Sequence, residues 1–590
     1  MCGICGEFRF DAQVADLDLV REMTARLRPR GPDDEGLYGD GALALGHRRL
    51  AIIDLSPRSH QPFVDLELGL TIVFNGTIYN YPELREKLKA RGHRFTSSGD
   101  TEVILKAYAE WGKECVTRLH GMFAFAIWNA REQSLFLARD RLGIKPLYYS
   151  HTGDVFRFAS TTQALLAADD VDTAIDPVAL HNLFMLHAVV PAPRTILKGI
   201  RKLAPGHCMM VNRLGDTREW PYWTLRARRP DRHYDEIEWR EMIHDALKRS
   251  VDRRLKIADV PVGVLLSGGL DSSLLVALLA EQGATDLKTF TIGFEDQPEE
   301  KGSEFEFSDP VAERYGTEHH KFHVPNADVL KRLPEAVRAM SEPMFAQDAV
   351  AFFLLSEQVS KQIKVVQSGQ GADEVFAGYF WYPRMNEAEG APIERFRPHY
   401  FDRSHEEFLS MVDPRYAGDD YTSAMIEEKL ESIEADRFID AVLALDVTTL
   451  IVDDPVKRVD NMTMAWGLEA RVPFLDHELV ELAASMPPEY KLADGGKGVL
   501  KAIARQLLPA KVIDRPKGYF PMPALKYVRG EFLAFMREVL DSQRARERGL
   551  YRRDYVERLL AEPDRHHTAI KGNKLWHLAA LEFWLQQQGL

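Results

Sequence analysis

Between residues 260 and 367 the chain alternates short apolar segments with helical ones, and this alternation constrains the fold more than any other feature. A strand, a crossover helix and a further strand predict a parallel sheet, because parallel neighbours need a long connection. In an open parallel sheet the carboxyl ends of the strands converge on one crevice, where ligands bind. The expected elements are strands at 260–266, 287–294, 320–324 and 363–367, and helices at 272–281 and before Gly316.

The first part of the chain, to about residue 210, follows a different pattern. Short alternating or apolar strands are broken by turns, with two helical stretches between them. This mixture favours a layered α/β sandwich over a parallel doubly wound sheet. The expected strands are 41–48, 70–75, 123–128, 134–140 and 156–159, and the expected helices are 82–91 and 101–111.

A polar, arginine-rich segment separates the two parts. Residues 212–238 contain two prolines and no apolar period, so we interpret them as a linker. The stretch 239–257 has apolar residues at every fourth position and predicts an amphipathic helix, and from about Phe396 the chain is mostly helical. Because 590 residues exceed the span of one core, we predict domains at 1–211 and 239–590, joined by this linker.

The overall charge argues against nucleic-acid or membrane binding. A formal net charge of −14 disfavours polyanionic partners, because such partners reward a basic surface. No apolar run approaches the roughly 20 residues that cross a bilayer, and the first residues lack the pattern of an export signal. Four cysteines in 590 residues form neither a disulfide framework nor a paired metal motif. We expect a cytoplasmic protein that binds small molecules.

Cys2 is a candidate nucleophile. Removal of Met1 would place a thiol and a free α-amine on one residue. A thiol attacks as the thiolate, and an α-amino group with a pKa of about 7.7 to 8.0 is a suitable base. Taken alone, Met1-Cys2 fits a buried structural cysteine in a first strand better, so the assignment depends on the rest of the chain.

A glycine-rich turn follows the first strand of the expected parallel sheet. Residues 267–273 read Ser-Gly-Gly-Leu-Asp-Ser-Ser and lead directly into a helix. Paired glycines let the backbone approach an oxygen-rich ligand, and the helix N-terminus supplies donors, which predicts a phosphate site. Asp271 suits phosphate only across a cation, so we interpret it as a magnesium ligand. The spacing is neither a P-loop nor a dinucleotide fingerprint, and a plain capped turn is the simpler alternative.

A second loop, residues 366–374, repeats the arrangement of apolar strand, small residues and acids. If both loops lie at the same edge of the sheet, they face one ligand. Asp373 is then the second magnesium ligand, because magnesium is held by one or two carboxylates together with nucleotide phosphates.

Together these motifs resemble the glutamine-dependent asparagine synthetase family, in which an N-terminal-nucleophile α/β/β/α glutaminase is fused to an ATP pyrophosphatase domain. The resemblance covers nearly the whole chain, implies ATP and Mg²⁺, and makes a homodimer an expectation. In the first part it rests on residues 2–4, 30–33, 47–50, 75–76, 98–102 and 139–149, and in the second on 267–273, 368–379 and 469–476.

The resemblance implies specific roles in the glutaminase part. Cys2 would attack the glutamine side-chain amide and release ammonia, while the Asn75 side chain and the Gly76 amide would hold the oxyanion. Arg49 would bind the glutamine α-carboxylate and Asp100 its α-ammonium, with Thr77 beside them. Without the family context, Arg49 is better read as one half of a surface ion pair.

The resemblance also implies roles in the second part. Lys517 would stabilise charge as an acyl-adenylate forms and collapses, although alone it would be read as a solvated loop lysine. ATP activates the carboxylate because a carboxylate is a poor electrophile, and a dry channel keeps ammonia nucleophilic. Asp271 and Asp373 would bind Mg²⁺. The other expected ATP-binding residues are Leu265 and Ile292 at adenine, and Ser267, Gly268, Gly269, Ser272, Ser273, Ser368 and Gly369 around the phosphates.

Some residues depart from the family pattern, and they bear on the identity of the acceptor, the carboxylate substrate that receives the ammonia. Gln370 and Glu374 are the residues expected to bind this acceptor. Gln370 stands where asparagine synthetases carry an acid, so an acceptor without a free α-amine fits better. Thr77 replaces a glutamate and Asn461 an arginine. Residues 368–376 and 380–383 look like the N-acetylglutaminylglutamine amidotransferase branch, which converts the carboxylate of an acetylated dipeptide into an amide and yields an uncharged osmolyte.

Four other functions are alternatives to this prediction. Asparagine synthesis from aspartate is the alternative enzyme activity. A nitrogen-sensing binder without turnover would not need Cys2, Asp271, Asp373 and Lys517 together. Adenylation of a transfer-RNA base is disfavoured by the acidic charge, and a redox role for Cys2-x-x-Cys5 by the lack of a thioredoxin-like pattern.

Overall fold

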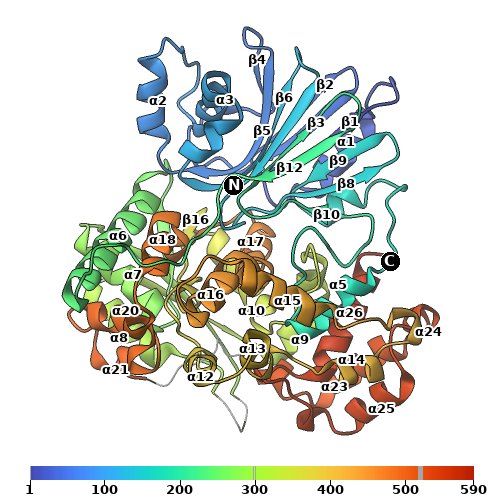
Figure 1. Cartoon of the computed structure of the whole chain (residues 1–590), viewed down its shortest axis with the longest axis vertical. Coiled ribbons are helices and arrows are strands. Elements are labelled where there is room, and N and C mark those ends of the chain that lie inside the picture. Colours follow the sequence, from blue (N-terminus) through green and yellow to red (C-terminus); the bar gives the residue numbers. More distant parts are fainter. Residues whose placement is uncertain (1, 297, 299–300, 516–522) are drawn as a thin grey trace.

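The computed structural model describes residues 2–296, 298, 301–515 and 523–590. A β-rich N-terminal part, blue to cyan in Figure 1, lies against a larger C-terminal part, green to red. Buried ion pairs such as that between Arg30 and Asp460 connect the two parts.

The N-terminal part is a sandwich of two antiparallel sheets covered by helices. Ile4 and Phe8 on β1 point between the sheets and Cys5 points toward α1 (Leu17–Arg26), as the two-residue period of a strand requires. Helices α2 (Tyr81–Lys89) and α3 (Asp100–Trp111) cover the second sheet. The first sheet runs β10 (Arg201–Lys202), β8 (Tyr148–Thr152), β9 (Val155–Ala159), β1 (Gly3–Arg9), β3 (Leu43–Arg49), β2 (Asp34–Asp40); the second runs β12 (Thr217–Pro221), β11 (His207–Val211), β7 (Ser134–Arg139), β6 (Gly121–Asn129), β5 (Leu70–Ile78), β4 (Phe63–Asp65).

The C-terminal part is built on a parallel sheet with helices on both faces. Val264 packs with α6 (Glu236–Lys256) and α7 (Leu270–Glu281), whereas Leu265 packs on the side of α9 (Asn326–Arg338) and α10 (Asp348–Ser360). Burial on both faces explains why the central strand β13 (Val262–Leu265) is apolar throughout. The order is β15 (Glu318–Val324), β14 (Lys288–Phe294), β13 (Val262–Leu265), β16 (Val365–Gln367), β17 (Glu469–Arg471), with α8 (Phe305–Tyr315) before β15.

The rest of the C-terminal part is mainly helical. One rod begins with α16 (Phe438–Leu445), passes through π-helical turns at Asp446–Leu450 and Val452–Val456, and ends with α17 (Lys457–Met464). Such turns are rare and often lie at functional sites. Further helices are α12 (Trp381–Glu387), α13 (Pro392–Tyr400), α14 (His405–Met411), α15 (Tyr421–Ser432), α18 (His477–Ser485), α20 (Gly498–Ala504), α23 (Gly530–Asp541), α25 (Arg553–Ala561) and α26 (Lys574–Gln587).

The expected fold class is confirmed: a layered α/β sandwich precedes a parallel-sheet domain with a helical continuation. The segment 212–238 contains β12, which pairs with β11, and the first turn of α6. Strand β17 lies in a region that the sequence indicated to be helical, and it joins the sheet next to β16. Among the described residues, no helix has both the length and the apolar character that crossing a bilayer demands.

Candidate active sites

Cys2 lies immediately before β1 (Gly3–Arg9), at one end of the sandwich. Its side chain is 7% exposed and lines a small cavity with Arg49 and Asp100. Burial raises the pKa of the Cys2 thiol, while a hydrogen bond with the Leu50 backbone and the charge of Arg49 oppose this shift. Arg49 is therefore a cation close enough to favour the thiolate, whereas burial of the thiol opposes ionisation.

Asn75 and Gly76 belong to β5, and both lie next to Cys2. The backbone nitrogen of Cys2 donates to Asn75 Oδ1 at 3.0 Å, and Asn75 Nδ2 is buried without a hydrogen-bond partner among the described residues. A buried donor without an acceptor is costly and suggests a bond that forms only with substrate. A Cβ at Gly76 would lie 2.2 Å from the Met122 carbonyl oxygen, so only glycine fits against β6.

The expected glutamine-binding residues converge on the same cavity. Arg49, at the end of β3, donates to the backbone carbonyl oxygens of Ser56, Ile53 and Asp54. Asp100, at the start of α3, accepts from the Ile78 amide at 3.0 Å. Burial raises the pKa of Asp100 to about 6, and the nearby charge of Glu469 adds to this shift.

Thr77 reveals a residue that the sequence did not predict for this site. Its hydroxyl donates to Glu469 Oε1 at 3.3 Å, and Glu469 lines the cavity although it belongs to β17 of the C-terminal part. Burial opposes ionisation of Glu469, but Arg471 outweighs it and lowers the pKa to about 2. Residues 469–476 belong to a family motif, but no pattern in the sequence indicates that they contact the glutaminase.

The loop between β13 and α7 forms a braced turn. The Ser267 amide donates to Ser272 Oγ at 3.2 Å, and the Gly269 amide donates to Ser267 Oγ at 3.3 Å. Gly268 has φ +76°, and a Cβ there would lie 2.6 Å from the Ser308 amide nitrogen. The tight turn therefore requires glycine at position 268.

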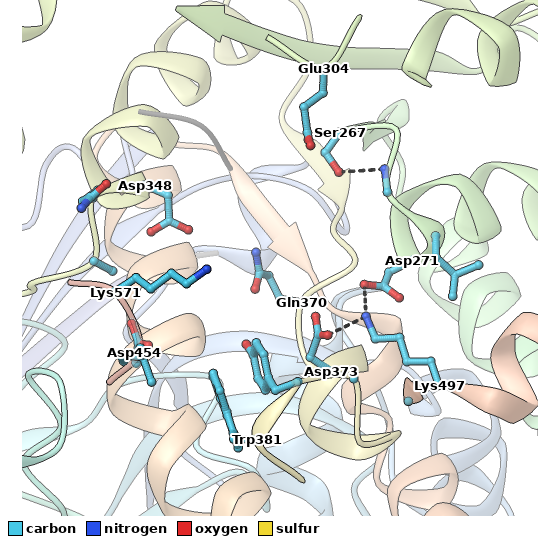
Figure 2. A pocket seen from close by; sticks show the side chains of 18 of the residues that line it. Ser267, Asp271, Glu304, Asp348, Gln370, Asp373, Trp381, Asp454, Lys497 and Lys571 are labelled. Carbon is cyan, nitrogen blue, oxygen red and sulfur yellow. Dashed lines mark hydrogen bonds and ion pairs between the residues drawn. The ribbon is translucent and has the colours of Figure 1, made fainter. Parts of the chain in front are cut away.

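The two carboxylates expected to bind magnesium do converge. Lys497 Nζ lies 2.6 Å from Asp271 Oδ2 and 2.8 Å from Asp373 Oδ1 (Figure 2). Burial would lower the pKa of Lys497, but the two carboxylates outweigh it and raise the pKa above the usual range. Two acids that share one cation form a donor set that fits a divalent ion. No pattern in the sequence indicates Lys497 at this site.

A cleft of about 470 Å³ opens at this end of the parallel sheet. Figure 2 shows Gln370 between the Asp271, Asp373 and Lys497 group and a second group, Asp348, Asp454 and Lys571. The expected site residues that line the cleft are Ser267, Gly269, Asp271, Gln370 and Asp373, and those that do not are Leu265, Gly268, Ser272, Ser273, Ile292, Ser368, Gly369 and Glu374.

The far side of the cleft combines residues of the 368–379 and 380–383 motifs with Arg458, which the sequence did not single out. Trp381 stacks on Tyr379 at 4.2 Å between ring centroids, and Tyr379 donates to the buried Glu374 carboxylate at 2.8 Å. Arg458 pairs with Asp348 at 3.2 Å and with Asp454. Lys517 lies outside the described residues; the preceding Arg515 lines the cleft and pairs with Glu304 at 2.8 Å.

Fold and sites together define a two-site enzyme class, in which an N-terminal-nucleophile glutamine amidotransferase is joined to a nucleotide-dependent synthetase domain. Residues 1–223 match the glutamine amidotransferase domain family, and residues 242–586 match the asparagine synthase family. The chain belongs to the asparagine synthetase family. The expectation of a glutamine-hydrolysing, ATP-dependent ligase is thereby confirmed at the level of the family.

Individual relatives extend over nearly the whole chain. Asparagine synthetase [glutamine-hydrolyzing] 3 of Bacillus subtilis is 33% identical, over 92% of this chain and 91% of that protein. Asparagine synthetase [glutamine-hydrolyzing] 1 of the same organism is 32% identical, over 99% of this chain and 96% of that protein. Among solved structures, glutamine phosphoribosylpyrophosphate amidotransferase from B. subtilis covers 54% of this chain and 90% of that chain with a TM-score of 0.30 and 16% identity, too weak a likeness to bear on function.

Proposed function

We propose that the protein hydrolyses glutamine at Cys2 and transfers the ammonia within the molecule to an acyl-adenylate made in the C-terminal cleft. The convergence of Cys2, Arg49 and Asp100 in one cavity, and of Asp271, Asp373 and the 267–273 loop at the other site, carries this proposal. We also propose that one domain ends at residue 211 and the next begins at residue 239. We further propose that the protein is a homodimer, which a measurement of its mass in solution tests.

In the glutaminase site, the thiolate of Cys2 attacks the side-chain carbonyl of glutamine and forms a thioester. The free Asn75 Nδ2 and the Gly76 amide stabilise the oxyanion, because both are rigid donors at the nucleophile. Arg49 holds the α-carboxylate. Asp100 and Thr77 face the α-ammonium, and Thr77 supplies a hydroxyl group where the family pattern has a carboxylate.

Glutamine binding should weaken in acid. The pKa of Asp100 is raised to about 6, so its carboxylate becomes protonated as the pH falls through that value and loses its attraction for an ammonium group. The KM for glutamine should therefore rise below pH 6. Asp100→Asn should raise the KM for glutamine by about 10- to 100-fold at pH 8, because one charge-assisted hydrogen bond is lost. The variant should also lose this pH dependence of KM. Steady-state glutamate release from pH 5.5 to 8.5 checks both effects, and an unchanged KM in the variant contradicts the role.

In the synthetase site, the 267–273 loop and Arg515 bind the phosphates of ATP, and Asp271 and Asp373 hold Mg²⁺. The metal neutralises charge on the phosphates when bound. Lys497 fixes the two carboxylates side by side. Lys517, which lies outside the described residues, keeps its expected role of stabilising charge as the acyl-adenylate forms and collapses. Leu265 and Ile292 lie on neighbouring strands, which supports a common place beside adenine.

The acceptor that we propose is N-acetylglutaminylglutamine, whose amide product is an uncharged osmolyte. Gln370 offers no charge to an α-ammonium group, and the cleft extends beyond it to an aromatic wall of Tyr379 and Trp381. A flat ring wall suits an extended chain of amide groups. Aspartate is the second candidate, because the B. subtilis relatives are asparagine synthetases.

Acceptor competition separates these two activities. With ATP, Mg²⁺ and glutamine, the acetylated dipeptide should give at least about tenfold faster AMP release than aspartate. This factor is expected because aspartate would leave one polar contact mismatched in a closed site. Gln370→Glu should reduce this preference, since it places an acid where an ammonium group would bind. Faster AMP release with aspartate alone contradicts the dipeptide proposal and leaves asparagine synthesis.

A further inference from the structure

A chain of buried polar contacts runs from Cys2 across the domain interface to α17. Arg30 Nε donates to the Cys2 carbonyl oxygen at 3.1 Å. The two terminal nitrogens of Arg30 donate to both carboxylate oxygens of Asp460, at 2.8 and 3.3 Å. Asp460 belongs to α17 of the synthetase domain, so a residue from the other domain holds the arginine that contacts the nucleophile.

The contacts around Arg30 leave it little freedom. Its side chain is 5% exposed and that of Asp460 is 3% exposed. A Cβ on the next residue, Gly31, would lie 2.3 Å from the Arg48 carbonyl carbon, so the backbone is pressed against β3. A bidentate Arg–carboxylate pair fixes orientation as well as charge, and the guanidinium is therefore aimed at the Cys2 carbonyl by Asp460.

Asp460 is in turn held by both domains. Lys145 Nζ, from the glutaminase, lies 3.0 Å from Asp460 Oδ1 and is 1% exposed. The neighbouring Asn461 accepts the Ser341 amide at 2.7 Å, which anchors α17 within the synthetase domain. Burial would raise the pKa of Asp460, but Arg30 and Lys145 outweigh it and lower the pKa, so the carboxylate is ionised between two cations.

We infer that Asp460 is a positioning residue of the glutaminase: it acts through Arg30 on the backbone of Cys2 and makes the nucleophile dependent on the synthetase domain. This goes beyond the proposed reaction and does not depend on the acceptor. Without the Asp460 charge, two buried cations lose their anion, and Arg30 leaves the Cys2 carbonyl. A shift of the thiol by a fraction of an ångström slows attack without removing the groups that bind glutamine.

The test compares Asp460→Asn with Asp453→Asn in the full chain. Asp453 is a matched control, because it is 4% exposed, lies on the same rod and forms an interdomain pair with Lys202 at 2.8 Å, yet none of its pairs reaches Cys2. In Asp460→Asn, kcat for glutamate release should fall by about tenfold or more with KM changed by less than about threefold. AMP release with ammonium chloride should stay within about threefold in both variants, and Asp453→Asn should keep its glutaminase kcat.

A second variant covers the case in which Asp460→Asn does not fold. Arg30→Lys keeps a cation for Asp460 but has no guanidinium fork to reach the Cys2 carbonyl as well, so it should show the same loss in kcat. The double variant should be no slower than either single variant, because both changes break one contact chain. Full glutaminase kcat in Asp460→Asn or Arg30→Lys overturns the inference. An equal loss in Asp453→Asn also overturns it, since that result means general loosening of the interface.

Discussion

Cys2→Ala will abolish glutamine-dependent amide synthesis, by at least about 1000-fold, because Cys2 carries the one thiol among the described residues that line the N-terminal cavity. AMP formation with ammonium chloride should remain within about threefold of the unchanged protein, because the synthetase cleft lies on the other domain and does not contain Cys2. Parallel assays of glutamate, AMP and amide product measure both effects.

Cys5 provides the matched control for Cys2. It lies three residues further along the same chain and is fully buried, its thiol packed against Thr24 at 3.3 Å, and burial raises its pKa to about 12. Cys5→Ser should therefore retain glutamine-dependent synthesis, with at most a loss in thermal stability. If Cys2→Ala lost ammonia-dependent synthesis as well, Cys2 would be structural and the assignment of the nucleophile would be wrong.

Asp271→Asn will remove AMP formation with either nitrogen source, by at least about 100-fold, because it takes away one of two carboxylates that converge on a single cation. Glutamate release should continue, since the glutaminase cavity does not include Asp271. The difference between the two assays separates loss of the ATP site from loss of folding.

A surface carboxylate of the same domain controls for this substitution. Asp309 on α8 is 46% exposed and pairs with Lys321 at 3.0 Å, so Asp309→Asn should leave both activities unchanged. Unaltered AMP production in Asp271→Asn refutes its metal-binding role. Loss of glutamate release in the same variant indicates that the substitution unfolds the chain instead.

The elements of both domains follow from short-range patterns, and the sequence predicts most of them. The strand–turn–helix around Ser267 is specified locally, by an apolar run, two glycines and a helix, and the structure has β13 and α7 there. Strand β17 was missed because its three residues carry no period of their own, and it is a strand only because β16 offers it a free edge. The secondary structure of such a short segment is determined by the strand with which it pairs, not by its own sequence.

The site residues that the sequence missed share one property: each reaches its partner across a long stretch of chain. Lys497 meets Asp271 from 226 residues away, and Glu469 meets Thr77 from 392 residues away. No local sequence pattern predicts such a long-range contact, because a lysine or glutamate that will be buried cannot be distinguished in the sequence from one on the surface. Asp271 and Asp373 could be predicted because both follow strands whose ends must converge in a parallel sheet.

Isotope transfer tests the coupling of the two sites most directly. The enzyme is given ATP, Mg²⁺, the acetylated dipeptide or aspartate, and glutamine labelled with ¹⁵N on its side chain, in a large excess of unlabelled ammonium ion. If ammonia passes within the molecule, the new amide carries ¹⁵N despite the excess, and Cys2→Ala removes that label. An amide that carries only nitrogen from the solution contradicts the account.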